Sequence, residues 1–421
     1  MRFKKIKLFT VLFAAVFLLF FSNDFGLIDV EKTAIITAVA IDLEDDGQYK
    51  VTAQIAVPEA TDSNTENERA QIAGKSRTVG GAIKNIGDTS GWFPQLAFCN
   101  LIIVGNSFRD KNIIRILDYF SKSLRIQDSA LVVMAEDKAE DLLKLSSPLD
   151  NVSSFALQKI ILKNAGLNRD VASCDIKTFC ADYYGIGSSC FMPVISVISQ
   201  KSENEKASAE NGGGSGDSGG ESGGGSGGGS SGGSSDGGSS SQTGGAKGDA
   251  IFSASKTALF VDGKTVGELD KKLTCVFNAL KKDFSFNTIE VNDVYPETES
   301  ENFLLTVFSK SAKTKLEVDE GGAKYFVDLS LFVKVSDKNS EYSDADYVKN
   351  LPLPHAVKLK AEEILTADIE DLIRTAIQTN CDFLGIKKEL YRKHNSFYAR
   401  FKDDLLENLQ FKVTVNVTGE R

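Results

Sequence analysis

The chain has 421 residues, of which 42% are hydrophobic and 25% charged, which is enough for two or three domains with packed cores. Its formal net charge of -10 argues against nucleic-acid binding, which depends on lysine and arginine, and against electrostatic adhesion of the folded part to anionic lipid. Six cysteines include no Cys-x-x-Cys pair, which argues against a zinc ribbon or a thioredoxin-like centre and leaves open a disulfide among Cys174, Cys180 and Cys190.

The first segment, residues 1–28, has the composition of an export signal or a membrane anchor. Basic residues precede an apolar run from Leu8 to Phe21, which as a helix is about 21 Å long, whereas a bilayer core is about 30 Å thick. Extension to Ile28 lengthens the run and places its polar residues at the outer end. Because no small-x-small cleavage site follows, we predict an uncleaved anchor, whose apolar residues are Leu8, Val11, Leu12, Phe13, Val16, Phe17, Leu18, Leu19, Phe20 and Phe21.

The next part, residues 29–200, is predicted to hold short strands and helices. A turn signal at Asp45–Gly47 separates two strands, and the polar stretch from Glu59 to Arg77 is predicted to be a loop. Ile113, Leu117 and Phe120 share one face of a helix. Alternation predicts a strand at 48–57, and apolar runs predict strands at 33–42, 100–105 and 129–135; helices are predicted at 80–88, 111–122, 139–147 and 151–166.

Residues 201–248 form a sharp change of composition. Within them, residues 211–245 are mostly glycine and serine with a few acidic residues, so they offer no side chains for a core, and we predict a flexible linker. The linker divides the chain into an N-terminal part, residues 29–200, and a C-terminal part, residues 249–421.

Residues 249–421 again mix strands and helices. Asp262-Gly263 is the turn signal of a hairpin. Few strands alternate one-for-one with helices, which favours an α+β fold with mixed, largely antiparallel sheets and two halves of up to three subdomains. Periodicity predicts strands at 302–310, 314–318, 324–337 and 410–419, and helices at 269–280, 357–381 and 396–409.

No short motif for catalysis or metal binding stands out. The two histidines, His355 and His394, lack a supporting pattern, and "AGKS" at 73–76 lacks the first glycine of a phosphate loop. The G-x-S-x-G match at 224–228 lies in the predicted linker, without the strand and helix that expose a nucleophile. Acidic runs lack the spacing of a calcium loop. The sequence therefore favours a binding or assembly protein over an enzyme.

Several stretches together resemble the Ger(x)C, or GerAC-like, family, the C subunits of nutrient-germinant receptors in endospore-forming bacteria. They are "EKTAIITAVAIDLEDDGQYKVTAQIAVPEA", "NLIIVGNSFRDKNIIRILDYF", "TALFVDGKTVGELD" and "IQTNCDFLGIKKELYRKHNSFYARF", in the family's order. The residues at family-motif positions, whose role the sequence does not define, are Asp42, Gly105, Asp262, Gly267, Asp270, Asp382, Gly385 and Arg392.

The resemblance implies a subunit without catalytic activity or cofactor, tethered on the extracytoplasmic side of the spore inner membrane. There it would act in nutrient-triggered germination by assembling with membrane-embedded A and B subunits. Relatives carry a lipidated cysteine where this chain has Ser22, so a peptide anchor would replace the lipid. Two alternatives stay open: an extracytoplasmic envelope enzyme with an unrecognised site, and an anchored structural or solute-binding protein.

Overall fold

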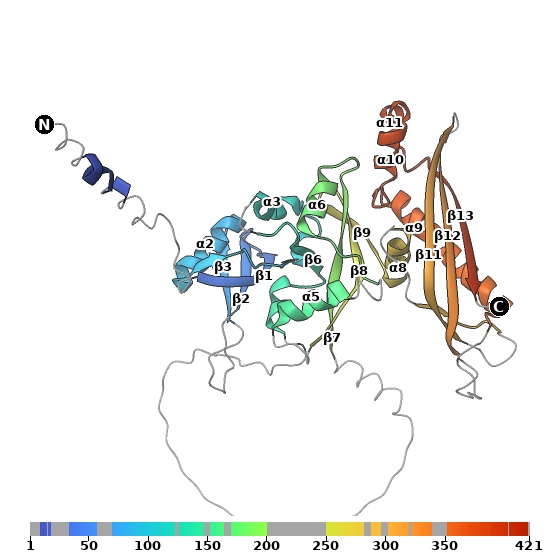
Figure 1. Ribbon diagram of the computed structural model, residues 1–421, viewed down its shortest axis with the longest axis horizontal. Coiled ribbons are helices and arrows are strands. Elements are labelled where there is room, and N and C mark those ends of the chain that lie inside the picture. Colours follow the sequence, from blue (N-terminus) through green and yellow to red (C-terminus); the bar gives the residue numbers. More distant parts are fainter. Residues whose placement is uncertain are drawn as a thin grey trace, which may run out of the picture.

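The computed structural model describes most of the chain outside the predicted linker. Within the described residues, two β-sheets with packed helices confirm the predicted α+β class (Figure 1). The sequence patterns did not predict that the centre of the larger sheet is parallel. The described residues are 9–14, 16–17, 33–56, 70–122, 126–145, 147, 152–163, 170–199, 250–281, 288–295, 302–319, 322–338, 352–402 and 404–419.

The larger sheet has the order β3-β2-β1-β5-β6-β7-β8-β9, and β4 pairs with the beginning of β1. Pairing is parallel from β1 to β7 and antiparallel on both flanks. β5 and β6 are buried along their whole length, as expected of parallel strands covered on both faces. The strands are β1 (Thr33–Leu43), β2 (Tyr49–Ala56), β3 (Ala70–Ser76), β4 (Phe93–Gln95), β5 (Leu101–Val104), β6 (Leu131–Ala135), β7 (Ser189–Ser199), β8 (Ala250–Val261) and β9 (Lys264–Leu269).

Helices cover both faces of this sheet. On one face lie α2 (Val79–Ser90), α3 (Ile114–Lys122) and α6 (Ile176–Tyr183), and their core includes the predicted helix face of Ile113, Leu117 and Phe120, each fully buried. On the other face, α4 (Ala139–Lys144) and α5 (Ser153–Lys163) bury a separate core. Alternate residues of β1 supply the two cores, as the period of a strand requires.

The strands on either side of the predicted linker are neighbours in this sheet. β7 and β8 pair antiparallel up to Ser199 and Ala250, so the chain on both sides of residues 201–248 belongs to one sheet. The predicted linker itself lies outside the described residues. The predicted hairpin turn is confirmed, because Asp262 and Gly263 take left-handed φ angles of 51° and 77° between β8 and β9.

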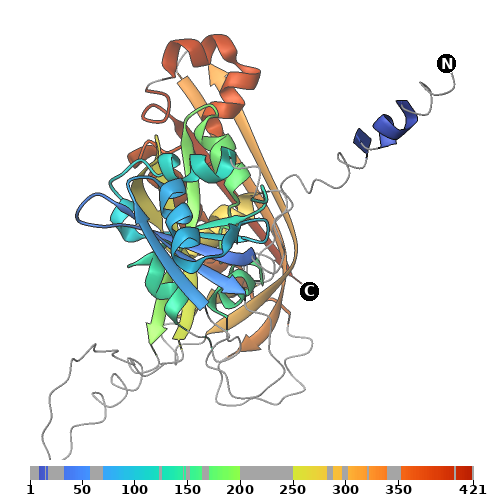
Figure 2. The same ribbon diagram turned by 90° about the vertical axis from the view of Figure 1, so that its left-hand side faces the viewer.

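The smaller sheet has the order β10-β11-β12-β13, with β12 and β13 parallel and the other pairs antiparallel. Figures 1 and 2 show its two longest strands running roughly vertically, across the long axis of the molecule. α8 contacts strands of both sheets, and α9 packs on α8 and β13. The elements are β10 (Thr288–Val291), β11 (Phe303–Asp319), β12 (Gly322–Lys338), β13 (Gln410–Gly419), α8 (Lys271–Leu280), α9 (His355–Gln378), α10 (Ile386–Lys393) and α11 (Asn395–Phe401).

The structure corrects some predicted elements. The expected loop from Glu59 to Arg77 contains β3, a polar edge strand whose conformation is set by its pairing with β2 rather than by hydrophobic alternation. The strands predicted at 302–310 and 314–318 are one strand, β11, and the helix predicted at 396–409 ends at Phe401. No element was predicted where α6 and β7 lie. All six cysteines are free thiols.

Candidate functional site

The first acidic family position, Asp42, holds a distant helix in place. Its carboxylate accepts hydrogen bonds from the backbone N–H groups of Ala139 (2.9 Å) and Glu140 (3.0 Å), at the beginning of α4. Gly105 makes room for it, because a Cβ atom there would lie 2.0 Å from Oδ1 of Asp42. Burial raises the pKa of Asp42, and the two N–H bonds oppose that rise. Two family positions therefore act together. Asp42 caps a helix that begins 97 residues further along the chain, and Gly105 leaves room for its carboxylate.

A polar hollow of about 300 Å³ lies beside Asp42, where β1, β5 and β6 end. Ligands often bind at the carboxyl ends of parallel strands. Here two of the acidic side chains already have cationic partners: Nζ of Lys50 lies 2.5 Å from Oε2 of Glu140, and Nζ of Lys75 lies 3.2 Å from Oε1 of Glu44. Across the described part of the chain, no cluster of three or more His, Cys, Asp or Glu residues is arranged to hold a metal ion.

The last acidic family position, Asp382, joins the C-terminal helices to the larger sheet. Its two carboxylate oxygens accept the N–H groups of Ile386 (2.7 Å) and Lys387 (2.8 Å), at the beginning of α10. Its own N–H donates to Oγ of Ser189 in β7, at 2.8 Å. Gly385 has a left-handed φ of 78°, which closes the turn between Asp382 and the helix. Burial raises the pKa of Asp382 to about 7 against the lowering effect of these N–H groups.

The other family positions lie apart from these two contacts. Asp262 is in the β8–β9 turn, and Asp270 caps α8 through a bond of 2.9 Å from the N–H of Leu273. Gly267 lies in β9, where a Cβ atom would approach Cγ2 of Thr379 to 3.0 Å. Arg392 is exposed on α10. The eight positions therefore do not converge on one site, and most of them act as caps or turns.

The predicted anchor is described only in part. Val11, Leu12, Phe13, Val16 and Phe17 are helical and exposed, whereas Leu8 and the residues from Leu18 to Phe21 lie outside the described residues. Among the helices that the structure describes, none is both long and apolar enough to cross a bilayer.

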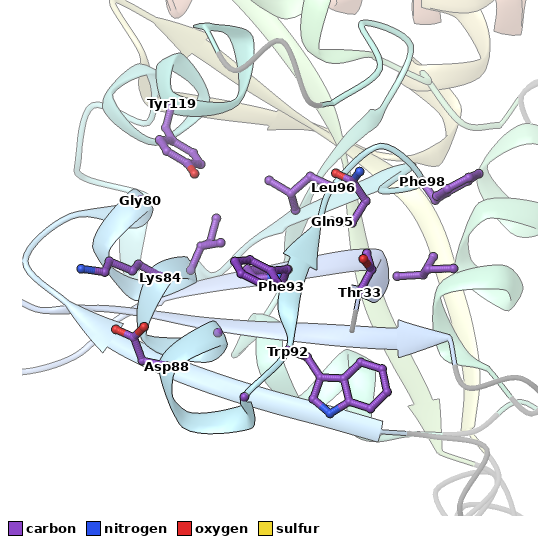
Figure 3. Close-up of a pocket in the computed structure, with 15 residues that line it drawn as sticks. Thr33, Gly80, Lys84, Asp88, Trp92, Phe93, Gln95, Leu96, Phe98 and Tyr119 are labelled. Atoms are coloured by element: carbon purple, nitrogen blue, oxygen red, sulfur yellow. The ribbon is translucent and has the colours of Figure 1, made fainter. Parts of the chain in front are cut away.

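A hollow of about 840 Å³ was not predicted from the sequence (Figure 3). It lies between α2, the segment around β4, and Tyr119 of α3. Its wall is aromatic: Trp92, Phe93 and Phe98 are 48%, 55% and 56% exposed. In Figure 3 these rings lie around Thr33, and Lys84 and Asp88 stand together at the other end. The arrangement can bury apolar or aromatic groups.

The local sequence explains why these aromatic rings remain exposed. Thr78 caps α2 by accepting the N–H of Gly81, and the helix ends at Gly91, whose φ is 72°. The chain then enters β4, which is three residues long and pairs parallel with the beginning of β1, so that Phe93 lies opposite Thr33. The run "GWFPQLAF" contains the chain's one tryptophan and has no helical or strand period. An aromatic run without a helical or strand period is the sequence signal that could have indicated this hollow.

Two family models match the chain in order. The model described as "Spore germination protein N-terminal domain" matches residues 27–197, and the one described as "Spore germination B3/ GerAC like, C-terminal" matches residues 255–421. Comparison with curated proteins gave no match. A solved structure described as the crystal structure of the GerBC protein is 14% identical, covers 93% of this chain and 100% of its own, and has a TM-score of 0.49.

Proposed function

Because the chain belongs to the family of GerAC-like spore germination proteins, we propose that it is a non-catalytic subunit of a spore germinant receptor. Its folded part would lie on the extracytoplasmic side of the spore inner membrane, tethered by residues 1–28. It would assemble there with membrane-embedded A and B subunits and act in nutrient-triggered germination.

The observation that carries this proposal is the pair of family matches. They follow each other along the chain, N-terminal domain before C-terminal domain, and leave out mainly the first residues and the glycine- and serine-rich segment. The chain therefore has both halves of the family's architecture.

The role of the acidic family positions supports a subunit that works by assembly. Asp42 and Asp382 accept two backbone N–H groups each, and both side chains are less than 10% exposed. A carboxylate held in this way stabilises a helix terminus. Asp42 and Asp382, two of the positions that carry the resemblance, thus stabilise the fold.

The test is germination of spores that lack the gene. We expect these spores to lose or slow their response to at least one nutrient, measured by the fall in optical density and by release of dipicolinic acid, and the intact gene to restore it. Normal germination with every nutrient tested, in a strain without a second copy of this family, would contradict the proposal.

Purification from spore membranes separates the alternatives. A tagged chain should bring multi-spanning membrane proteins with it if it is a receptor subunit. Recovery of the chain alone would favour an anchored structural or solute-binding protein. Spores carrying Asp382→Asn should lose germination only as far as the folded protein is lost, because the proposal gives this carboxylate no catalytic role.

A further inference from the structure

The three aromatic side chains of the hollow form an exposed patch on one short segment. Trp92, Phe93 and Phe98 lie within seven residues, and each exposes about half of its surface. Exposed apolar groups that gather in one place usually mark a surface that meets a partner or a membrane. We call these three residues the aromatic patch.

The aromatic patch lies where the chain arrives from the predicted anchor. Phe93 pairs with Thr33, the first residue of β1, and Figure 3 shows Trp92 and Phe98 on either side of Thr33. Only a few residues separate Ile28, the end of the predicted anchor, from Thr33, and five extended residues span at most about 18 Å. A chain that leaves a bilayer at Ile28 therefore keeps Thr33, and with it the patch, close to the lipid surface.

The chemistry of the patch suits the boundary between lipid and water. Tryptophan and other aromatic rings gather at the level of the lipid headgroups. The charged residues of the hollow, Lys84 and Asp88, have opposite signs, so the patch has no local excess of positive charge with which to select anionic lipid. Contact would come from burial of the rings, which is compatible with the net charge of -10.

We propose that the aromatic patch inserts into the membrane interface and fixes the orientation of the first domain on the bilayer. This inference rests on the proposed tethering of residues 1–28. The patch is then a second contact with the same lipid surface, and it turns a flexible tether into an oriented one. A protein partner would need the same rings, so the experiment must distinguish lipid from protein.

The test uses the full-length protein in vesicles of phosphatidylcholine with phosphatidylglycerol, without partners. Trp92 is the chain's one tryptophan, so its fluorescence reports on the patch directly. We expect its emission to move to shorter wavelength in vesicles and to be quenched by phosphatidylcholine brominated near the headgroup, while aqueous acrylamide loses access to it. Flotation of the vesicles measures the tether separately.

Two variants that retain Trp92 give the comparison. Phe93→Ser/Phe98→Ser should lose most of the quenching and still float, with circular dichroism showing an unchanged fold. Phe155→Ser/Leu162→Ser removes exposed apolar groups, 42% and 57% exposed, from α5 on the opposite face of the sheet, and should leave quenching unchanged.

Three results would overturn the inference. If the protein floats with the vesicles while acrylamide still quenches Trp92, the tether binds the membrane but the aromatic patch does not insert into it. Trp92 that is shielded only in spore membranes with other subunits would assign the patch to a protein partner. Protein that does not float would overturn the tether and this inference together.

Discussion

The surroundings of Asp382 and of Trp92 differ in almost every respect. Asp382 is 6% exposed, and both its carboxylate oxygens and its N–H have backbone or side-chain partners. Trp92 is 48% exposed on a loop. Asp382 is one of the motif positions that carry the resemblance, whereas Trp92 lies within the matched residues 27–197 but is not a motif position. The difference indicates that this motif position preserves the fold, and under our proposal the surface that meets the membrane lies elsewhere.

The strongest test of this contrast is Asp382→Ala. The change leaves two buried N–H groups without their acceptor, and each unsatisfied buried donor costs about 1–3 kcal/mol, so we expect a loss of about 3 kcal/mol in the free energy of unfolding. Urea denaturation measures it. Asp270→Ala is the matched control, because Asp270 is an exposed cap with one bond and should cost about 1 kcal/mol. Equal losses of stability in the two variants would mean that the burial of Asp382 adds nothing to the effect of its hydrogen bonds.

The next effect in size is expected from Gly105→Ala. The φ of Gly105 is -72°, which alanine adopts freely, so any cost arises from the added methyl group 2.0 Å from Oδ1 of Asp42. We expect a loss of about 1–3 kcal/mol, as for overpacking of a buried site. In an Asp42→Ser background the oxygen is displaced, and the same alanine should cost clearly less. An additive double variant would contradict the close contact.

The pH dependence of stability separates a buried carboxyl from an exposed surface. The pKa of Asp382 is raised from 3.8 to about 7, so the folded protein keeps a proton that the unfolded chain releases in this range. The free energy of unfolding contributed by this group therefore falls as the pH rises from about 4 to about 7, by at most about 1.4 kcal/mol per pH unit. Subtracting the pH profile of Asp382→Asn isolates the effect, and parallel profiles would contradict it.

The sequence predicted the elements that have a clear period and missed those that depend on distant partners. Strong alternation or a helical stripe identified β2, α3, α9 and β13. β3 is polar and becomes a strand only through its pairing with β2. The family resemblance placed Asp42 and Gly105, but their contact joins residues 63 positions apart and completes a cap on α4, which no local pattern reveals. The aromatic patch was missed because exposure is a property of the folded surface.

The smallest expected effect completes the contrast. Phe93→Ser/Phe98→Ser removes two rings that are 55% and 56% exposed, so we expect the free energy of unfolding to change by less than about 0.5 kcal/mol per substitution. Phe120→Ser, at a fully buried ring, should instead cost at least about 3 kcal/mol. Urea denaturation in the absence of lipid measures both. A large loss from the surface variant would show that the patch supports the fold. If the variant is as stable as the unmodified protein and contacts vesicles more weakly, the two rings serve an interaction. The reason is that rings exposed to water contribute little to the stability of the fold.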